Sequence, residues 1–416
     1  MTNDPHTDNR APLIGLPTLM RMALAGEDLK SLGMRLLQRA QNDPGDANAL
    51  MDLSTVVQLS GDPETARNLQ AEALKVRQLY SLPAAAKQAG LRLLAIMGPG
   101  DLNANTPLEF LVEGSDVSLE MLYVTAELPF PEQVPEHDVL FVATGESDAN
   151  QPLLESIGTD LQGWPEPVLN RPERIVRLSR DGVWGLLHSV PGVAIPVSAR
   201  IDREALERLD RGETPPAELL DGGDFPLIVR PTGSHAGQGL ARLDDAGAVA
   251  AYLATVAEES FYLSPFVDYR GGDGLFRKYR IALIGGRPFA VHMAISENWM
   301  IHYLNAGMRE SAAKRAEEER FMTEFDDNFA RRHEAALRTI TERFGLDYLA
   351  IDCAETAAGD LLIFEVDSSM VVHDMDPVEI FPYKQPQMRK VFHAFRGLLA
   401  KAVDSGGPPG KCLSVK

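Results

Sequence analysis

The chain has 416 residues and a formal net charge of −20, with 40 Lys and Arg residues against 60 Asp and Glu residues. This length suggests two or three domains, with enough apolar content for real hydrophobic cores. The acidic excess argues against nucleic acid as a general partner, because phosphate backbones are bound by clustered Lys and Arg side chains.

Cysteine usage and hydropathy predict a reducing, aqueous environment. The two cysteines, Cys353 and Cys412, are too few for a disulfide framework. No apolar run reaches the length of a membrane span, and the N-terminal residues lack the basic and apolar parts of a signal peptide. We therefore predict a cytoplasmic protein with no membrane partner.

The N-terminal part is predicted to be helical. Residues 1–17 are expected to be disordered, and a helical period then runs through residues 18–82, with breaks at Asp43-Pro44-Gly45 and Gly61-Asp62-Pro63. This segment resembles a tetratricopeptide helix pair, but one and a half units are too few for a free-standing array. It is expected to pack on the rest of the chain or on a second copy, as a plain helical cap or as a peptide-binding surface. The predicted helices span 29–40, 47–59 and 64–80.

Strands and helices alternate over residues 88–170, which predicts a parallel sheet. An apolar strand from Leu91 runs into a glycine turn at residues 98–100. That turn lacks the full dinucleotide-binding fingerprint and is interpreted as a tight turn. The other predicted elements are strands at 119–125 and 137–143 and a helix that starts near Leu108.

A strand, a cation and a glycine-rich loop follow one another over residues 225–239. Arg230 ends the apolar run, and Gly233, Gly237 and Gly239 lie in the loop. Glycines allow backbone N–H groups to approach phosphate oxygens without obstruction by a Cβ atom. The sequence favours a phosphate-binding loop here over a flexible surface hairpin.

A basic strand follows this loop. The run from Phe276 to Ala294 is predicted to be a hairpin with its turn at Gly285-Gly286, and Lys278 and Arg280 share one face of its first strand. Two aligned cations suit an anionic substrate, although a solvated edge is the alternative. The other elements predicted in this half are an Ala-rich helix over 245–258, a strand over 261–268 interrupted by Pro265, a long charged helix over 310–344 and a helical region over 378–402.

An acidic hairpin is the most informative stretch. Two apolar runs flank a turn at Gly359, and the period of two places Glu365 and Asp367 on the same face as Leu361 and Ile363. If the hairpin closes with Asp352 opposite Glu365, three carboxylates meet on one face. Such carboxylates repel one another unless a cation lies among them, and Mg²⁺ prefers oxygen ligands of this kind. An ordinary hairpin with an acidic edge is the alternative.

Taken in order, these segments resemble the ATP-grasp superfamily, and specifically its RimK-like carboxylate-amine (peptide) ligase branch, from about Asn170 to Ala400. The shared order is an Asn and cation segment, a cation with a small-residue loop, a hinge strand, a basic strand, an Asn-x-Gly segment at Asn305 and the acidic hairpin. The resemblance implies an α+β fold in which two α+β subdomains enclose ATP. We expect this ATP-grasp domain over 171–403, an α/β pre-grasp domain over 88–170 before it, and a flexible tail over 404–416.

The resemblance also implies roles for single residues. Arg180 and Arg230 stand where the family usually has lysines, and Asp367 stands where it commonly has asparagine, which changes donor geometry and adds negative charge. The implied catalytic residues are Arg280 and His373, and the implied Mg²⁺ ligands are Asp352, Glu365 and Asp367. The implied nucleotide-binding residues are Arg180, Arg230, Ser234, Gly237, Gly239, Pro265, Phe266, Val267, Asp268, Lys278 and Asn305.

The predicted function is that of an ATP- and Mg²⁺-dependent ligase that joins a carboxylate to an amine through an acyl phosphate. Its partners would be a small molecule or peptide carrying the carboxylate, an amine acceptor, and a peptide or a second copy of the chain bound by residues 18–82. A non-catalytic nucleotide-binding scaffold is one alternative. A phosphotransferase on the same fold, giving a stable phosphorylated product, is another.

Overall fold

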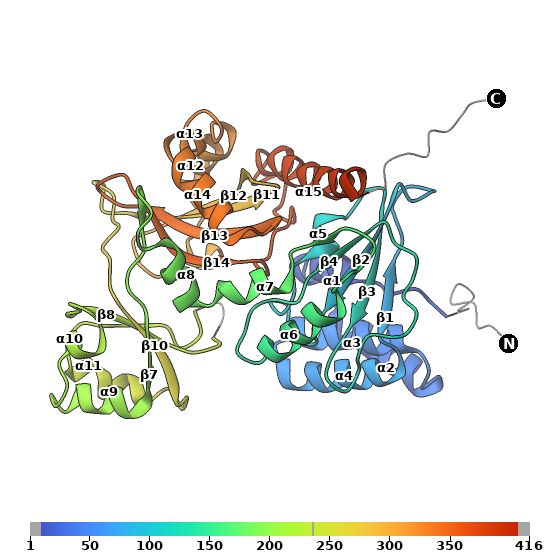
Figure 1. Cartoon of the computed structure of the whole chain (residues 1–416), viewed down its shortest axis with the longest axis horizontal. Coiled ribbons are helices and arrows are strands. Elements are labelled where there is room, and N and C mark those ends of the chain that lie inside the picture. The colour runs from blue at the N-terminus through green and yellow to red at the C-terminus, as the bar shows by residue number, and fades with distance from the viewer. Residues whose placement is uncertain (1–9, 235–236, 407–416) are drawn as a thin grey trace.

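The structure is a computed structural model of the chain and describes residues 10–234 and 237–406. It contains three β-sheets with helices packed against them, so the predicted α+β class is confirmed. Figure 1 shows the N-terminal part in blue at the right, a second part in yellow and green at the lower left, and the C-terminal sheet in orange above it. Within the described ranges, no helix combines the length and apolar character needed to cross a membrane.

Four helices open the chain, and aspartates begin three of them. Asp28, Asp46 and Asp62 each accept a hydrogen bond from the backbone N–H three residues further on, which satisfies an otherwise unpaired donor of the first turn. The third predicted helix was extended too far, because residues 79–82 pair with the first sheet instead. The helices are α1 (Leu16–Leu24), α2 (Leu29–Asn42), α3 (Ala47–Leu59) and α4 (Pro63–Val76).

The segment before α1 is held in place, so the prediction of disorder through residue 17 is wrong for residues 10–17. The backbone N–H groups of Ile14 and Gly15 donate to the buried carboxylate of Asp52, and the N–H of Leu16 donates to Glu109. The helical segment also shares a hydrophobic core with the first sheet, through α3 and α4. It therefore packs on the rest of the chain, as expected for so short a helical array.

Glu109 lines a cavity of about 70 Å³ between α3 and the first sheet. Burial raises the pKa of this carboxyl to about 7 despite the hydrogen bond from Leu16, and the nearby Asp52 adds to the effect. The folded state thus disfavours the ionised form, so the contribution of Glu109 to stability is highest below about pH 4.5 and falls until about pH 7.

Replacing Glu109 with Gln is therefore expected to stabilise the protein at pH 8 and to change little at pH 4.5. One pKa unit corresponds to about 1.4 kcal/mol, so the gain in unfolding free energy at pH 8 is expected to be about 2–3 kcal/mol. Urea unfolding at both pH values measures it. Glu113→Gln, which removes the partly exposed ion pair with Arg21, is the control and should cost no more than about 1 kcal/mol at pH 8. A Glu109→Gln gain of the same size at both pH values would contradict the argument.

The first sheet has the order β1-β3-β2-β4-β5, with β1 antiparallel and the others parallel. Its central strands are apolar on both faces because helices cover them. The predicted alternation of strand and helix is confirmed here, with the short helix at Leu108. The elements are β1 (Leu79–Leu82), β2 (Leu91–Met97), α5 (Leu108–Leu111), β3 (Val117–Tyr123), β4 (Val139–Val142), α6 (Gln151–Asp160) and β5 (Val168–Leu169).

A buried asparagine connects this part to the C-terminal sheet. Asn170 is fully buried with a positive φ of 49°, a conformation that asparagine tolerates better than most residues. Its side-chain oxygen accepts hydrogen bonds from the backbone N–H groups of Asp347 and Tyr348, and its amide donates to the Tyr348 carbonyl. The chain then continues through α7 (Pro172–Ile175) and α8 (Arg180–Leu187).

The second sheet is antiparallel, with the order β7-β10-β8-β9, and has a hydrophobic core of its own. That core includes Leu206, Val229 and Phe261 and is separate from the large core of the molecule. The elements are β7 (Ala199–Asp202), α9 (Arg203–Asp210), α10 (Pro216–Leu219), β8 (Leu227–Pro231), β9 (Ala241–Leu243), α11 (Gly247–Leu253) and β10 (Ser260–Pro265).

The third sheet has the order β12-β11-β13-β14-β6, with only the β14 and β6 pair parallel. The long helix predicted over 310–344 is divided into three, so that prediction is wrong in its continuity. The elements are β6 (Val193–Ala194), β11 (Phe276–Ile284), β12 (Arg287–Ser296), α12 (Ala312–Thr323), α13 (Phe329–Arg332), α14 (Glu334–Phe344), β13 (Tyr348–Glu355), β14 (Leu361–Asp367) and α15 (Lys384–Gly406).

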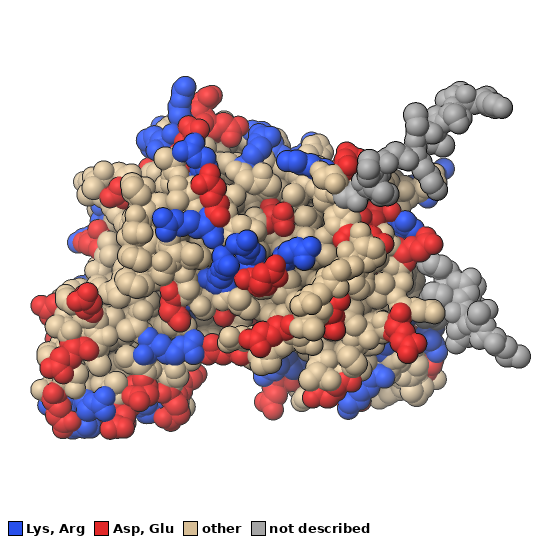
Figure 2. Space-filling view, viewed as in Figure 1, with Lys and Arg blue, Asp and Glu red and all other residues tan. Residues whose placement is uncertain are grey.

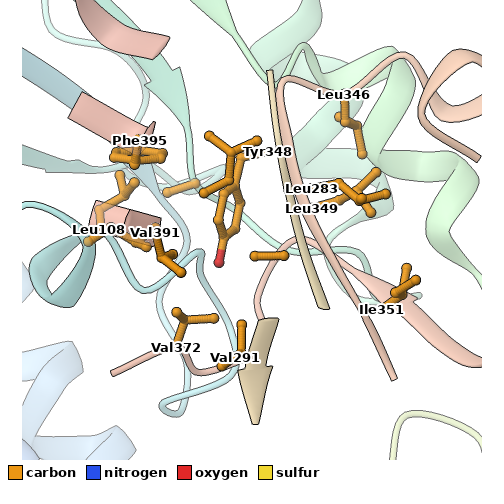
Figure 3. Close-up of a cluster of buried hydrophobic side chains, with 14 of the residues drawn as sticks. Leu108, Leu283, Val291, Leu346, Tyr348, Leu349, Ile351, Val372, Val391 and Phe395 are labelled. Carbon is orange, nitrogen blue, oxygen red and sulfur yellow. The ribbon is translucent and has the colours of Figure 1, made fainter. Parts of the chain in front are cut away.

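A shared core fixes the third sheet to the N-terminal part. Figure 3 shows Tyr348 of β13 beside Phe395 and Val391 of α15 and Leu108 of α5. The rings of Tyr348 and Phe395 meet edge to face at 5.7 Å, and both side chains are fully buried. The acidic hairpin therefore rests on a rigid support.

Candidate active site

The acidic hairpin closes in the register that brings its carboxylates to one face. Asp352 of β13 lies opposite Glu365 of β14, and Ala350 lies opposite Asp367, so the three carboxylates belong to one face of the sheet. A β-bulge at Phe364 shifts the pairing next to Asp352.

The bulge corrects one expectation. Leu361 and Ile363 were predicted on the face of the acids, but Ile363 lies opposite Cys353 and both apolar side chains are buried on the other face. The extra residue lets one strand bury its apolar end in the core and still present Glu365 and Asp367 on the opposite side.

The basic strand β11 runs beside the acidic hairpin and supplies cations to the same face. Arg280 lies directly opposite Asp352 and donates to both of its oxygens at 2.7 and 3.0 Å, while the ammonium of Lys278 lies 2.6 Å from the carboxylate. Burial alone would raise the pKa of Asp352, but the two cations outweigh it and hold this pKa well below its usual range. The prediction that Lys278 and Arg280 share one face of their strand is confirmed, and this face is the one that carries the three acids.

Arg180 pairs with Glu365, and the charge of Arg230, from a distant segment, acts on both groups. Arg180, at the start of α8, donates to the Glu365 carboxylate at 3.0 Å and to the Phe364 carbonyl at 3.1 Å. Arg230 of β8 lies near both groups: burial, followed by repulsion from Arg180, lowers its pKa to about 10. Burial would raise the pKa of Glu365, and Arg180 and Arg230 together lower it. Two cations facing one carboxylate form a place where an anion is favourable.

Figure 2 shows Lys and Arg side chains beside acidic ones near the centre of the view, over α7 and α8. Most of the remaining surface in this view carries scattered charges of both signs. Cations and carboxylates thus lie side by side on this face of a strongly acidic protein.

The donor chemistry fits Mg²⁺, since carboxylate oxygens on adjacent strands are ligands of the kind that it prefers. Among the residues that the structure describes, however, no three His, Cys, Asp or Glu side chains stand close enough to hold a metal ion together. Asp352 is already neutralised by Arg280 and Lys278, and Glu365 is paired with Arg180. Asp352 is thus held by two cations and Glu365 by one, so Glu365 is the better candidate of the two for a direct ligand, and the three-acid metal set stays a prediction.

The glycine-rich loop folds back on its own strand and reaches the C-terminal part. Arg230 donates to the hydroxyl of Ser234 at 3.2 Å and to the Ser234 carbonyl. Gly237 and Gly239 have positive φ, and a Cβ atom at Gly237 would overlap the imidazole Nε2 of His302. A larger residue at position 237 would therefore force the His302 side chain or the loop to shift, and the positive φ also favours glycine.

Replacing Gly237 with Ala is expected to weaken ATP binding by about tenfold, equivalent to about 1.4 kcal/mol, because the loop must move away from His302. Calorimetric titration measures the change. Gly233→Ala is the matched control, since Gly233 has the same positive φ but open space around its Cβ position. Adding His302→Ala to Gly237→Ala should restore most of the affinity. An equal loss in Gly233→Ala would show that backbone strain, and not the contact with His302, is responsible.

The residues of the predicted hinge strand, 265–268, and Asn305 contact groups that are close to them in the chain or in the second sheet. Pro265 ends β10, the N–H of Phe266 donates to the Pro226 carbonyl, and Asp268 pairs with Arg270. Asn305 accepts from the backbone N–H of His302 and caps a short turn. Their nucleotide-binding roles, with that of Val267, stay predictions.

His373 lies in the loop that follows β14. Its ring is 6.1 Å from that of Phe110, and burial lowers its pKa, which keeps the imidazole neutral. The carbonyl of Val371 in the same loop accepts a hydrogen bond from Arg280 at 3.0 Å. The loop therefore borders the cationic face, and the catalytic role of His373 stays a prediction.

Glu146 is a candidate residue that the sequence analysis missed. It follows β4 at the carboxyl end of a parallel strand, where ligands of such sheets commonly bind. Burial and then the charge of Asp367 raise its pKa to about 7. A search of the carboxyl ends of the predicted parallel strands for charged residues would have found it.

No known protein family matches the sequence of this chain, and no curated protein does. Among solved structures it is similar to the D-alanine--D-alanine ligase from Bacillus anthracis complexed with ATP, with 14% identity over 77% of this chain and 100% of that chain and a TM-score of 0.44. It is also similar to VanG D-Ala:D-Ser ligase from Enterococcus faecalis, with 13% identity, coverage of 75% and 100%, and a TM-score of 0.44. A RimK domain ATP-grasp protein from Sphaerobacter thermophilus shares 15% identity, with coverage of 75% and 99% and a TM-score of 0.39. At these TM-scores, a functional assignment depends on the residues of the site itself.

Proposed function

We propose that this protein is an ATP- and Mg²⁺-dependent ligase of the ATP-grasp kind, which joins a carboxylate to an amine. The observation that carries the proposal is the ion pair of Arg180 with Glu365, on which the charge of Arg230 also acts, beside a sheet face where Lys278 and Arg280 neutralise Asp352. These groups come from five separate elements, α8, β8, β11, β13 and β14, whose strands belong to the second and third sheets. A surface without a ligand has no physical need of such an arrangement.

The phosphates of ATP would replace Glu365 as the counter-ions of the two arginines. Arg230 has the lower pKa expected of a buried cation beside a second cation, so an added anion would stabilise both. The loop that carries Ser234, Gly237 and Gly239 would cover the phosphates and exclude water. Water exclusion protects the activated carboxylate from hydrolysis.

Glu365 and Asp367 would hold Mg²⁺, which when bound supplies positive charge that offsets the phosphate oxygens. In the first step a carboxylate oxygen of the acid substrate attacks the γ-phosphorus, and ADP leaves. In the second step the amine attacks the acyl carbon, the C–O bond to phosphate breaks, and a proton leaves the nitrogen. Arg280, held by Asp352 and the Val371 carbonyl, would face the negative charge that develops.

His373 and Glu146 would serve the amine side. A neutral imidazole is the form that can accept the proton lost by the amine. The charges of Glu146 and Asp367 favour an ammonium group before that proton leaves. A further partner could bind the helical segment, where Leu24, Met34 and Leu37 are exposed.

Calorimetric titration with ATP, with and without Mg²⁺, tests the nucleotide site. Mass spectrometry of reactions containing panels of carboxylic acids and amines then tests the chemistry: an amide product with ADP supports the ligase, and a stable phosphorylated product would indicate a phosphotransferase. Mg²⁺-dependent binding without turnover across the panel favours the scaffold. Failure of the protein to bind ATP would overturn all three hypotheses: the ligase, the phosphotransferase and the nucleotide-binding scaffold.

A further inference from the structure

A groove on the third sheet lies outside the site described above. It has a volume of about 590 Å³ and runs between α15, the turn that joins β11 to β12, and the end of α12 with the loop that follows it. Its floor is apolar, with Phe289 and Ala290 from β12, Met322 from α12, Phe325 from the loop after it, and Leu398 from α15. None of the residues proposed to bind ATP, Mg²⁺ or the reacting groups lines it.

The rim of the groove is mainly basic, with three Lys and Arg side chains against one exposed carboxylate, that of Asp326. Arg287, Lys390 and Lys401 line it with exposed side chains, as does His393. Within residues 10–234 and 237–406, none of the three cations forms an ion pair; Arg287 lies over the Phe289 ring at 5.5 Å. On a chain of net charge −20, cations left without carboxylate partners around an apolar floor favour an acidic ligand.

The shape of the groove indicates an elongated ligand. Lining residues recur along one face of α15 at positions 387, 390, 394, 398 and 401. At a rise of 1.5 Å per residue, this stretch is about 21 Å long. That length matches about four turns of a second helix, and apolar grooves of this kind commonly accept one face of an amphipathic helix.

We propose that this groove docks an acidic amphipathic helix of a partner protein, with apolar side chains on the floor and Asp or Glu side chains against the basic rim. The chain's own C-terminal residues 407–416 do not have the required charge, because they contain two lysines and no acidic residue. The docking site lies apart from the proposed ligase chemistry and would recruit or position a protein.

The test uses the full-length protein and a fluorescein-labelled peptide of about 18 residues, with Leu and Phe on one helical face and Glu on the other. Fluorescence anisotropy is expected to show micromolar binding that weakens with added salt. The double variant Lys390→Glu/Lys401→Glu should weaken binding by at least about tenfold. Ala394→Trp, which fills the groove without changing its charge, should weaken it similarly.

The matched control is Lys30→Glu/Lys87→Glu, which changes the net charge by the same amount. Lys30 and Lys87 are exposed, do not line the groove and are distant from its residues in the sequence. It should alter peptide binding by less than about twofold. Thermal unfolding of each variant verifies that it is folded. Equal weakening in the control, or equal binding of a scrambled peptide, would overturn the proposal. Displacement of the peptide by phosphatidylserine vesicles that bind the groove more tightly would overturn it in favour of a lipid surface.

Discussion

Replacing Glu365 with Gln is expected to abolish the Mg²⁺ dependence of ATP binding and to lower the affinity for Mg²⁺-ATP by at least about 100-fold, or about 2.7 kcal/mol. The amide keeps the size of the side chain and one acceptor for Arg180 but loses the negative charge that a metal ion requires. Calorimetric titration of ATP with and without Mg²⁺ measures both effects.

Glu342→Gln is the control for this experiment. Glu342 is an exposed residue of α14 whose nearest cation, Arg338, is 3.9 Å away, so its replacement should leave the titrations unchanged. If Glu365→Gln bound ATP with the Mg²⁺ dependence of the parent, Glu365 would not be a metal ligand and the proposed site would have to be abandoned. ATP binding that becomes tighter without Mg²⁺ would agree with release of Arg180 and Arg230 for the phosphates.

Replacing Arg280 with Met is expected to cost about 3 kcal/mol of unfolding free energy and to stop turnover. Asp352 is almost fully buried, and losing its bidentate partner leaves Lys278 as its remaining cation. Urea unfolding measures the stability, and ADP release measures the activity.

Arg277→Met is the matched control, because Arg277 lies on the same strand but pairs with Asp273 and Glu317 on the other face. That change should cost about 1 kcal/mol or less and leave ATP binding intact. A second variant, Arg280→Lys, keeps a charge near Asp352 and should recover much of the stability, but less of the activity, because an ammonium lacks the planar donor fork. Equal stability losses in Arg280→Met and Arg277→Met would show that the buried pair contributes little.

The alternation of side chains along each strand was predictable because it is a local property, and it placed Glu365 with Asp367 on one face and Lys278 with Arg280 on one face. The register that sets Asp352 opposite Glu365 was only a condition at that point, because a regular ladder continued from the pair of Glu355 and Leu361 would set Asp352 opposite Phe364. The bulge at Phe364 was not predictable in the same way. It depends on which apolar side chains the core accepts, and that is decided by packing against other elements.

Contacts between residues that are far apart in the sequence could be predicted only in part. Arg180 and Glu365 are 185 residues apart, and their contact followed from the resemblance and not from any local pattern. Glu146 lacked such a guide, because its meeting with Asp367 depends on how the first sheet packs on the third. The end of the third helix was also misjudged: residues 77–80 continue a helical period, but pairing with β3 gives Tyr80 a fully buried place in the first sheet.

The separate core of the second sheet has a mechanical consequence. Because its apolar side chains pack with one another and not with the rest of the molecule, this sheet can turn as a rigid unit without exposing apolar surface. The chain enters this sheet through the connection from β6 to β7 and leaves it through the connection from β10 to β11. A change of backbone dihedral angles in these two connections is enough to rotate the sheet relative to the rest of the molecule. Arg230 and the glycine-rich loop travel with this unit, whereas Arg180 and the acidic hairpin stay with the larger body. Rotation of the second sheet away from the larger body and back would therefore separate Arg230 from Arg180 and bring them together again. A nucleotide bound between the two arginines would hold the two parts in the closed arrangement.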